Sequence, residues 1–196
     1  MYKKQMLFQK IVCYALLIAA ALVFVYSLGL MTDLYDALYS TIRNANKLDN
    51  TQVTGSRIYY DMQPFNRQFT NVSIGLILVT LTLFVTNTHS RRKYYIGNFI
   101  SVALCTVSNV LATYWVVTNV MEYKKTFLQI NFEELKEFSE RRNSYYTEST
   151  FWFDASYVVF GFLCLMTVLL IVNLVLKLIV MKEEKRLIGS RKDVSA

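Results

Sequence analysis

The side chains that most often carry out chemistry are few in this sequence and lie far apart. The three cysteines, Cys13, Cys105 and Cys164, all fall in apolar stretches, no two form a CxxC pair, and His89 is the only histidine. A zinc site built from cysteine and histidine needs about four ligands that converge. We therefore expect no metal or cofactor, and we interpret the cysteines as small packing residues.

Catalytic motifs are also missing from the sequence. GxSxG, HExxH, GxGxxG and the phosphate-binding P-loop do not occur, and no carboxylate lies in the middle of an apolar stretch. Acid–base catalysis and proton relays both need titratable groups within hydrogen-bond reach. We therefore do not expect an enzyme, and an intramembrane enzyme is the least favoured of three hypotheses.

The most polar of the apolar stretches is residues 96–121. Small and polar side chains recur in it at helical spacing and are expected to share one face, a set we call the polar stripe: Asn98, Ser101, Cys105, Ser108, Asn109, Ala112 and Asn119. An unpaired amide in hydrocarbon is costly, so Asn109 near the middle must find a partner. Helices in lipid associate through hydrogen bonds and small residues, which adds four candidates for helix contacts: Ala15, Ala19, Gly75 and Gly161.

Long helices in a membrane must position these residues. The chain has 196 residues, of which 54% are hydrophobic and 18% charged, whereas about a quarter are charged in a typical soluble domain. Four apolar runs, 11–31, 69–88, 96–121 and 155–176, each reach the roughly 20 residues that a helix needs to cross a bilayer. We predict an all-α polytopic membrane protein with four transmembrane helices. A cleaved signal peptide is the alternative for the first run, which is too long for one.

Basic residues predict the orientation of the chain. Residues 1–10, 89–95 and 177–196 hold 12 of the 21 lysines and arginines, and the two longer loops hold the other nine. Because cytoplasmic segments are enriched in lysine and arginine, both termini and the 89–95 link are expected in the cytoplasm, at the cell membrane. The loops 32–68 and 122–154 are then extracellular. The net charge of +7 reflects this topology, and we expect no nucleic acid as a partner.

Both extracellular loops carry helical patterns and are predicted to form short helical hairpins. The first loop continues from the first run without a proline, and Asn131 with Glu134 gives the second a start typical of a capping box. Asp154 is expected to cap the fourth transmembrane helix. Lys177 at the other end of that helix is expected to reach towards the headgroups.

A comparison of the sequence with itself suggests a duplicated helical hairpin. At an offset of 86, seven of the 31 positions from Arg57 to Asn87 are identical, among them the pairs Tyr59 with Tyr145 and Asn87 with Asn173. We therefore hypothesise that the first two and the last two transmembrane helices are repeats of one unit.

Two functional hypotheses follow from the polar stripe. The stripe can pack inside the four-helix bundle or face another subunit, and the first hypothesis is a non-catalytic membrane subunit that packs against and stabilises or regulates a larger complex such as a transporter. If it faces other copies of the chain, the alternative is a homo-oligomeric channel or carrier with the stripe lining the conduit. The expected partners are membrane lipid and either a larger membrane protein or further copies of this chain.

Overall fold

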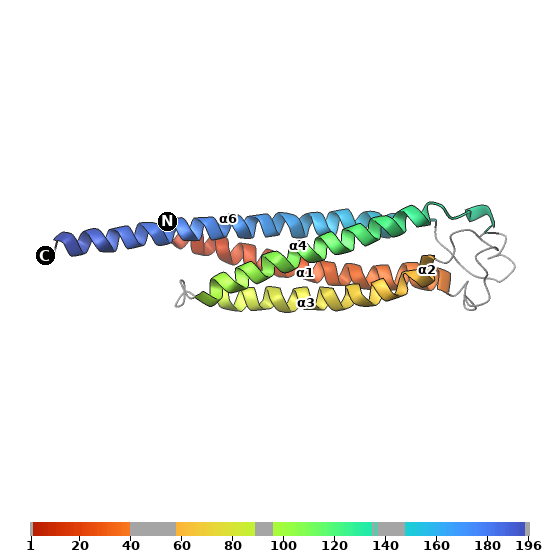
Figure 1. Cartoon of the computed structure of the whole chain (residues 1–196), viewed down its shortest axis with the longest axis horizontal. Coiled ribbons are helices and arrows are strands. Elements are labelled where there is room, and N and C mark those ends of the chain that lie inside the picture. Colours follow the sequence, from red (N-terminus) through yellow and green to blue (C-terminus); the bar gives the residue numbers. More distant parts are fainter. Residues whose placement is uncertain (1, 40–57, 89–95, 135, 137–147, 195–196) are drawn as a thin grey trace. The chain divides into compact units, whose positions relative to one another are not determined.

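The computed structural model describes residues 2–39, 58–88, 96–134, 136 and 148–194, and in these residues the chain is helical with short turns (Figure 1). The helices are α1 (Tyr2–Tyr39), α2 (Ile58–Asp61), α3 (Gln63–Thr88), α4 (Ile96–Phe127) and α6 (Phe151–Val194). Four of them, α1, α3, α4 and α6, are long and apolar enough to cross a membrane. The prediction of an all-helical chain with four such helices is therefore confirmed.

The long helices extend beyond the apolar runs from which they were predicted. α1 continues without a break to Tyr39, and α6 continues through the basic tail to Val194. α3 begins at Gln63 with Pro64 in its first turn, where the missing amide hydrogen costs no helical bond. Hydropathy marks the part of a helix that lipid can cover, while hydrogen bonding carries the helix further.

Several predictions lie outside the described residues. These are His89 with the 89–95 link, most of the first loop (40–57), and residues 137–147 of the second loop, which include Tyr145. The repeat hypothesis therefore stays a prediction. The start of the second loop is described: the backbone amide of Glu134 donates to Asn131 Oδ1 over 3.4 Å, as the capping pattern predicts.

The helices pack into two compact units, each of which is described by itself. The termini unit comprises Met1–Ala20, Leu76–Val110 and Leu163–Ala196, and the loop unit comprises Ala21–Gly75 and Leu111–Phe162. Each of the four long helices contributes a segment to both units. The two units have different interiors, one aromatic and one rich in amides.

The loop unit has an aromatic core. The ring of Tyr26 on α1 lies 5.7 Å from Phe69 on α3 and 6.3 Å from Phe160 on α6, measured between centroids. Its hydroxyl donates to the backbone carbonyl of Trp152 over 2.9 Å. One turn before Phe69 on the same helix, Phe65 packs 5.2 Å from Trp115 of α4. Edge and tilted ring contacts of this kind stabilise a core beyond the area that they bury.

The first turn of α6 is tied to α4 at Asp154. This carboxylate accepts hydrogen bonds from Lys124 Nζ and from Thr150 Oγ1, the second over 2.7 Å. The predicted capping role is taken instead by Ser149, whose Oγ accepts from the backbone amide of Phe151 over 3.2 Å. α6 therefore begins earlier than predicted, and Asp154 lies in its first turn, where it also joins α6 to α4.

Gly29 allows α1 and the start of α6 to approach closely in the loop unit. A Cβ atom at this position would overlap ring carbons of Trp152. That indole also lies beside Tyr26 and Phe151, so it has neighbours on more than one side. Gly75 offers the opposite case, because a Cβ there would meet nothing within 4 Å.

We predict that Gly29→Ala lowers the stability of the protein and that Gly75→Ala does not. Overpacking a filled core costs about 1–3 kcal/mol, whereas alanine in place of an open helical glycine is neutral or favourable. The melting temperatures of both variants are measured by thermal unfolding in detergent, followed by tryptophan fluorescence. Equal melting temperatures for the two variants would contradict the close approach of Gly29 to Trp152.

Candidate functional site

Polar side chains from all four long helices meet in the interior of the termini unit. We call this set the amide–lysine cluster, and each member is at most 7% exposed: Gln5, Gln9, Asn87, Asn98, Ser101, Asn173 and Lys177. On α1 and α6 the members are four residues apart, and on α4 they are three apart, which places each pair on one helix face. The helical repeat thus turns isolated polar residues in the sequence into one buried group.

A chain of hydrogen bonds runs through the cluster from helix to helix. Gln5 Nε2 on α1 lies 3.0 Å from both Asn173 Oδ1 on α6 and Gln9 Oε1. Gln9 Nε2 donates to the backbone carbonyl of Asn87 on α3. Asn87 Nδ2 in turn donates to Ser101 Oγ on α4 over 2.9 Å. Every long helix therefore contributes a side chain to one continuous network.

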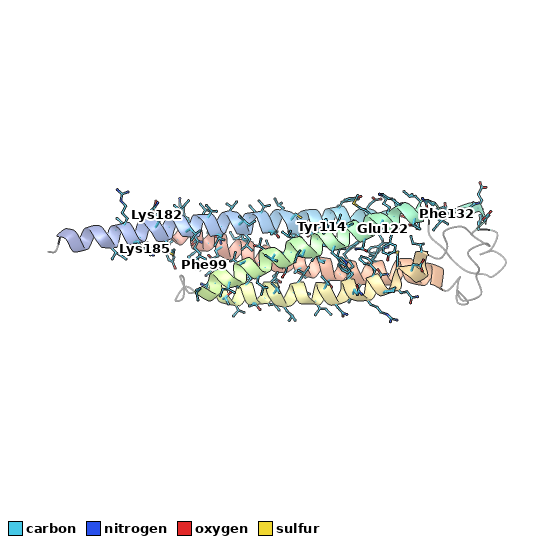
Figure 2. All side chains as sticks on the ribbon, in the orientation of Figure 1. Phe99, Tyr114, Glu122, Phe132, Lys182 and Lys185 are labelled. Carbon is cyan, nitrogen blue, oxygen red and sulfur yellow. The ribbon has the colours of Figure 1, made fainter. Side chains whose placement is uncertain are left out.

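Lys177 is the charged member of the cluster. Its Nζ donates to Asn87 Oδ1 over 3.3 Å and lies 5.1 Å from the ring centroid of Phe99 (labelled in Figure 2). The residue is 4% exposed, so the prediction that it reaches for the headgroups is wrong. The amide oxygen and the aromatic face instead give the ammonium group partners inside the protein.

No carboxylate of the neighbouring helix segments balances this charge. Residues 1–20, 76–110 and 163–182 contain no aspartate or glutamate at all. The side-chain amide of Asn87 makes two kinds of hydrogen bond: its Oδ1 accepts from the ammonium group, and its Nδ2 donates to Ser101. Because an amide is both donor and acceptor, it can link a cation to a neutral hydroxyl network.

The polar stripe predicted on α4 contributes to this interior. Asn98 and Ser101 belong to the amide–lysine cluster, and Asn109 Nδ2 donates to Thr167 Oγ1 on α6 over 2.9 Å. The partner that Asn109 was expected to need is thus inside the chain. Cys105 is fully buried one turn away, and its Sγ lies 3.7 Å from the same Nδ2.

The other predicted contact residues are placed less uniformly. Ala19 and Ala112 are buried, whereas Ala15, Ser108, Asn119 and Gly75 are half-buried and Gly161 is exposed. A Cβ atom added to Gly75 or Gly161 would meet nothing within 4 Å among the described residues. These two glycines therefore form no close helix contact in this part of the chain.

Five cluster members were missed from the sequence: Gln5, Gln9, Asn87, Asn173 and Lys177. Gln5 and Gln9 precede the first apolar run, in a segment assigned to the cytoplasm, and Lys177 follows the fourth. The available signal was their spacing, since Gln5 with Gln9 and Asn173 with Lys177 each lie four apart. Asn87 and Asn173, which match at the offset of 86, both belong to the cluster.

The chemistry of the cluster is hydrogen bonding and charge burial. Its side chains are amides, a hydroxyl and one ammonium group, and the described residues hold no group of three or more histidine, cysteine or acidic side chains that could bind a metal. Comparison with protein-family models, with curated proteins and with solved structures finds no match to this chain.

We predict that Asn87→Leu lowers the free energy of unfolding by about 2 kcal/mol, because it leaves the buried ammonium group of Lys177 without its acceptor. Lys177→Met removes that charge, so it should recover part of the loss when combined with Asn87→Leu. The free energy of unfolding in detergent is measured for the two single variants and for the double variant. Thr82→Val is the control, because this exposed hydroxyl on the same helix bonds the carbonyl of Leu78. Strictly additive effects of the two substitutions would contradict the pairing.

Proposed function

We propose that this chain is a non-catalytic integral membrane subunit that packs against, and stabilises or regulates, a larger membrane complex such as a transporter. The observation that carries the proposal is the placement of the polar stripe. Asn98, Ser101 and Asn109 are each at most 4% exposed, and Ser101 and Asn109 bond side chains of α3 and α6. Side chains used in this way hold a bundle together, which leaves the outer surface for interactions with other molecules.

The proposed orientation rests on the distribution of basic residues. We place both termini and the 89–95 link in the cytoplasm and the loops 32–68 and 122–154 outside the cell membrane. In the sequence, the segments that carry the amide–lysine cluster adjoin the proposed cytoplasmic termini and link, and the segments of the loop unit adjoin the proposed extracellular loops.

We place the contact with the larger partner on the outer face of α6 around Gly161. Tyr157 is 48% exposed and Val158 is 76% exposed. Gly161 is also exposed, and because it has no side chain its backbone is uncovered. Lipid covers apolar side chains as well as another helix does, so apolarity alone does not favour a partner. A small residue does, because it lets two helix backbones approach closely.

The alternative of a homo-oligomeric channel or carrier has less support. It needs the polar stripe to face a conduit, whereas the most polar members of the stripe bind within the chain. The half-buried Ser108 and Asn119 are left for such a surface, and the Nδ2 of Asn119 bonds the carbonyl of Trp115 over 2.7 Å.

A pull-down tests the proposed function directly. The protein is recovered in mild detergent through a C-terminal tag, and its partners are identified by mass spectrometry and by native mass. A larger membrane protein in stoichiometric amount is the expected result. A homo-oligomer without another protein would contradict the proposal and favour the channel.

The proposed contact predicts the effect of one substitution on that recovery. Gly161→Leu should reduce the recovered partner at least about fivefold, equivalent to roughly 1 kcal/mol, because the side chain separates the helices. Gly75→Leu on α3 is the control, because a Cβ atom there also meets nothing within 4 Å, and it should leave recovery unchanged. Both variants should unfold at the temperature of the unmodified protein. Full recovery with Gly161→Leu would exclude this face.

A further inference from the structure

A hollow of about 290 Å³ lies along the first three turns of α1 in the termini unit. It is lined by Tyr2, Lys3, Met6, Leu7 and Lys10. Met6 is 8% exposed, whereas Leu7 is 61% exposed and both lysines are exposed. The lining therefore combines apolar side chains with two cationic groups.

The two lysines can act on one ligand. Residues 3 and 10 are seven positions apart, which puts them on one helix face about 10 Å apart along the axis. Each lysine side chain reaches about 6 Å from its Cα, so both ammonium groups can approach one anionic group between them. No carboxylate of α1 competes there, because the first acidic residue of the sequence is Asp33.

The same face of α1 continues as an apolar surface. Ile11, Tyr14 and Ile18 follow the lysines towards the middle of the helix and are 56%, 56% and 57% exposed. An occupant that suits the whole face has an anionic head and a long apolar tail. A soluble phosphate or an acidic peptide would leave the apolar part without a partner. Basic groups at the end of transmembrane helices are suited to anionic lipid headgroups.

We propose that this hollow binds an anionic phospholipid, with its phosphate between Lys3 and Lys10 and an acyl chain along Leu7, Ile11 and Tyr14. The site does not depend on the identity of the protein partner. It adds a defined lipid contact to α1, on the helix face opposite Gln5 and Gln9 of the amide–lysine cluster.

Lipid binding to the purified full-length chain tests the site. Binding of phosphatidylglycerol and of phosphatidylcholine is measured in detergent by native mass spectrometry. We expect the unmodified protein to prefer phosphatidylglycerol, and Lys3→Gln with Lys10→Gln to weaken that binding roughly thirtyfold. The control removes two exposed lysines of another helix, Lys182→Gln with Lys185→Gln on α6; these project from the helix in Figure 2 and should change binding less than about threefold.

Each other outcome overturns the proposal. If both double variants lost lipid binding equally, the lipid would be attracted to positive charge in general. If Lys3→Gln with Lys10→Gln kept normal binding, these two lysines would not form the site. Competition by glycerophosphoglycerol, the headgroup without acyl chains, at the affinity of the lipid would indicate a free phosphate compound.

Lys3→Arg with Lys10→Arg is a further control. It keeps the charges and should bind the lipid normally, which separates loss of the site from loss of the fold.

Discussion

The arrangement of the termini unit depends on how a buried ammonium group is satisfied without a carboxylate. Residues 1–20, 76–110 and 163–182 around Lys177 contain no acidic residue, and its ammonium group contacts the Asn87 amide and the Phe99 ring instead. That amide is linked through Ser101 and Gln9 to α4 and α1. Because unpaired polar groups are costly in a low-dielectric interior, moving one helix would leave several partners unsatisfied at once. The cluster therefore specifies how these helices pack against one another.

The loop unit reaches a defined packing by other means. Rings from α1, α3, α4 and α6 contact one another there, and Gly29 makes room for Trp152. Aromatic contacts tolerate a wider range of geometries than a hydrogen-bond network does, so shape complementarity at Gly29 supplies the specificity. In both units the polar and aromatic contacts lie on the inward faces of the helices. The outward faces therefore remain for the proposed contact with a partner.

Hydropathy was sufficient to predict the four long helices, because crossing a bilayer requires a length of apolar sequence that few other structures need. The helical repeat was sufficient to group Asn98, Ser101 and Asn109. The direction of a side chain at a helix end was harder to predict. Lys177 can reach the headgroups or turn inward, and the choice depends on an acceptor 90 residues away, Asn87. Gly75 and Gly161 were equally hard to predict, because the small size of a glycine permits a close helix contact but does not show whether a neighbouring helix makes it.

The central claim is that Asn98, Ser101 and Asn109 of the polar stripe are packed inside the bundle, and thiol labelling tests it most directly. Ser101→Cys is introduced into a chain whose three cysteines are replaced by alanine, and Lys182→Cys provides an exposed reference. In membrane fragments open on both sides, a soluble charged thiol reagent should modify position 101 at least about a hundredfold more slowly than position 182, because reaction requires local opening of the bundle. Similar rates at the two positions would show a water-filled path along α4 and would contradict the account.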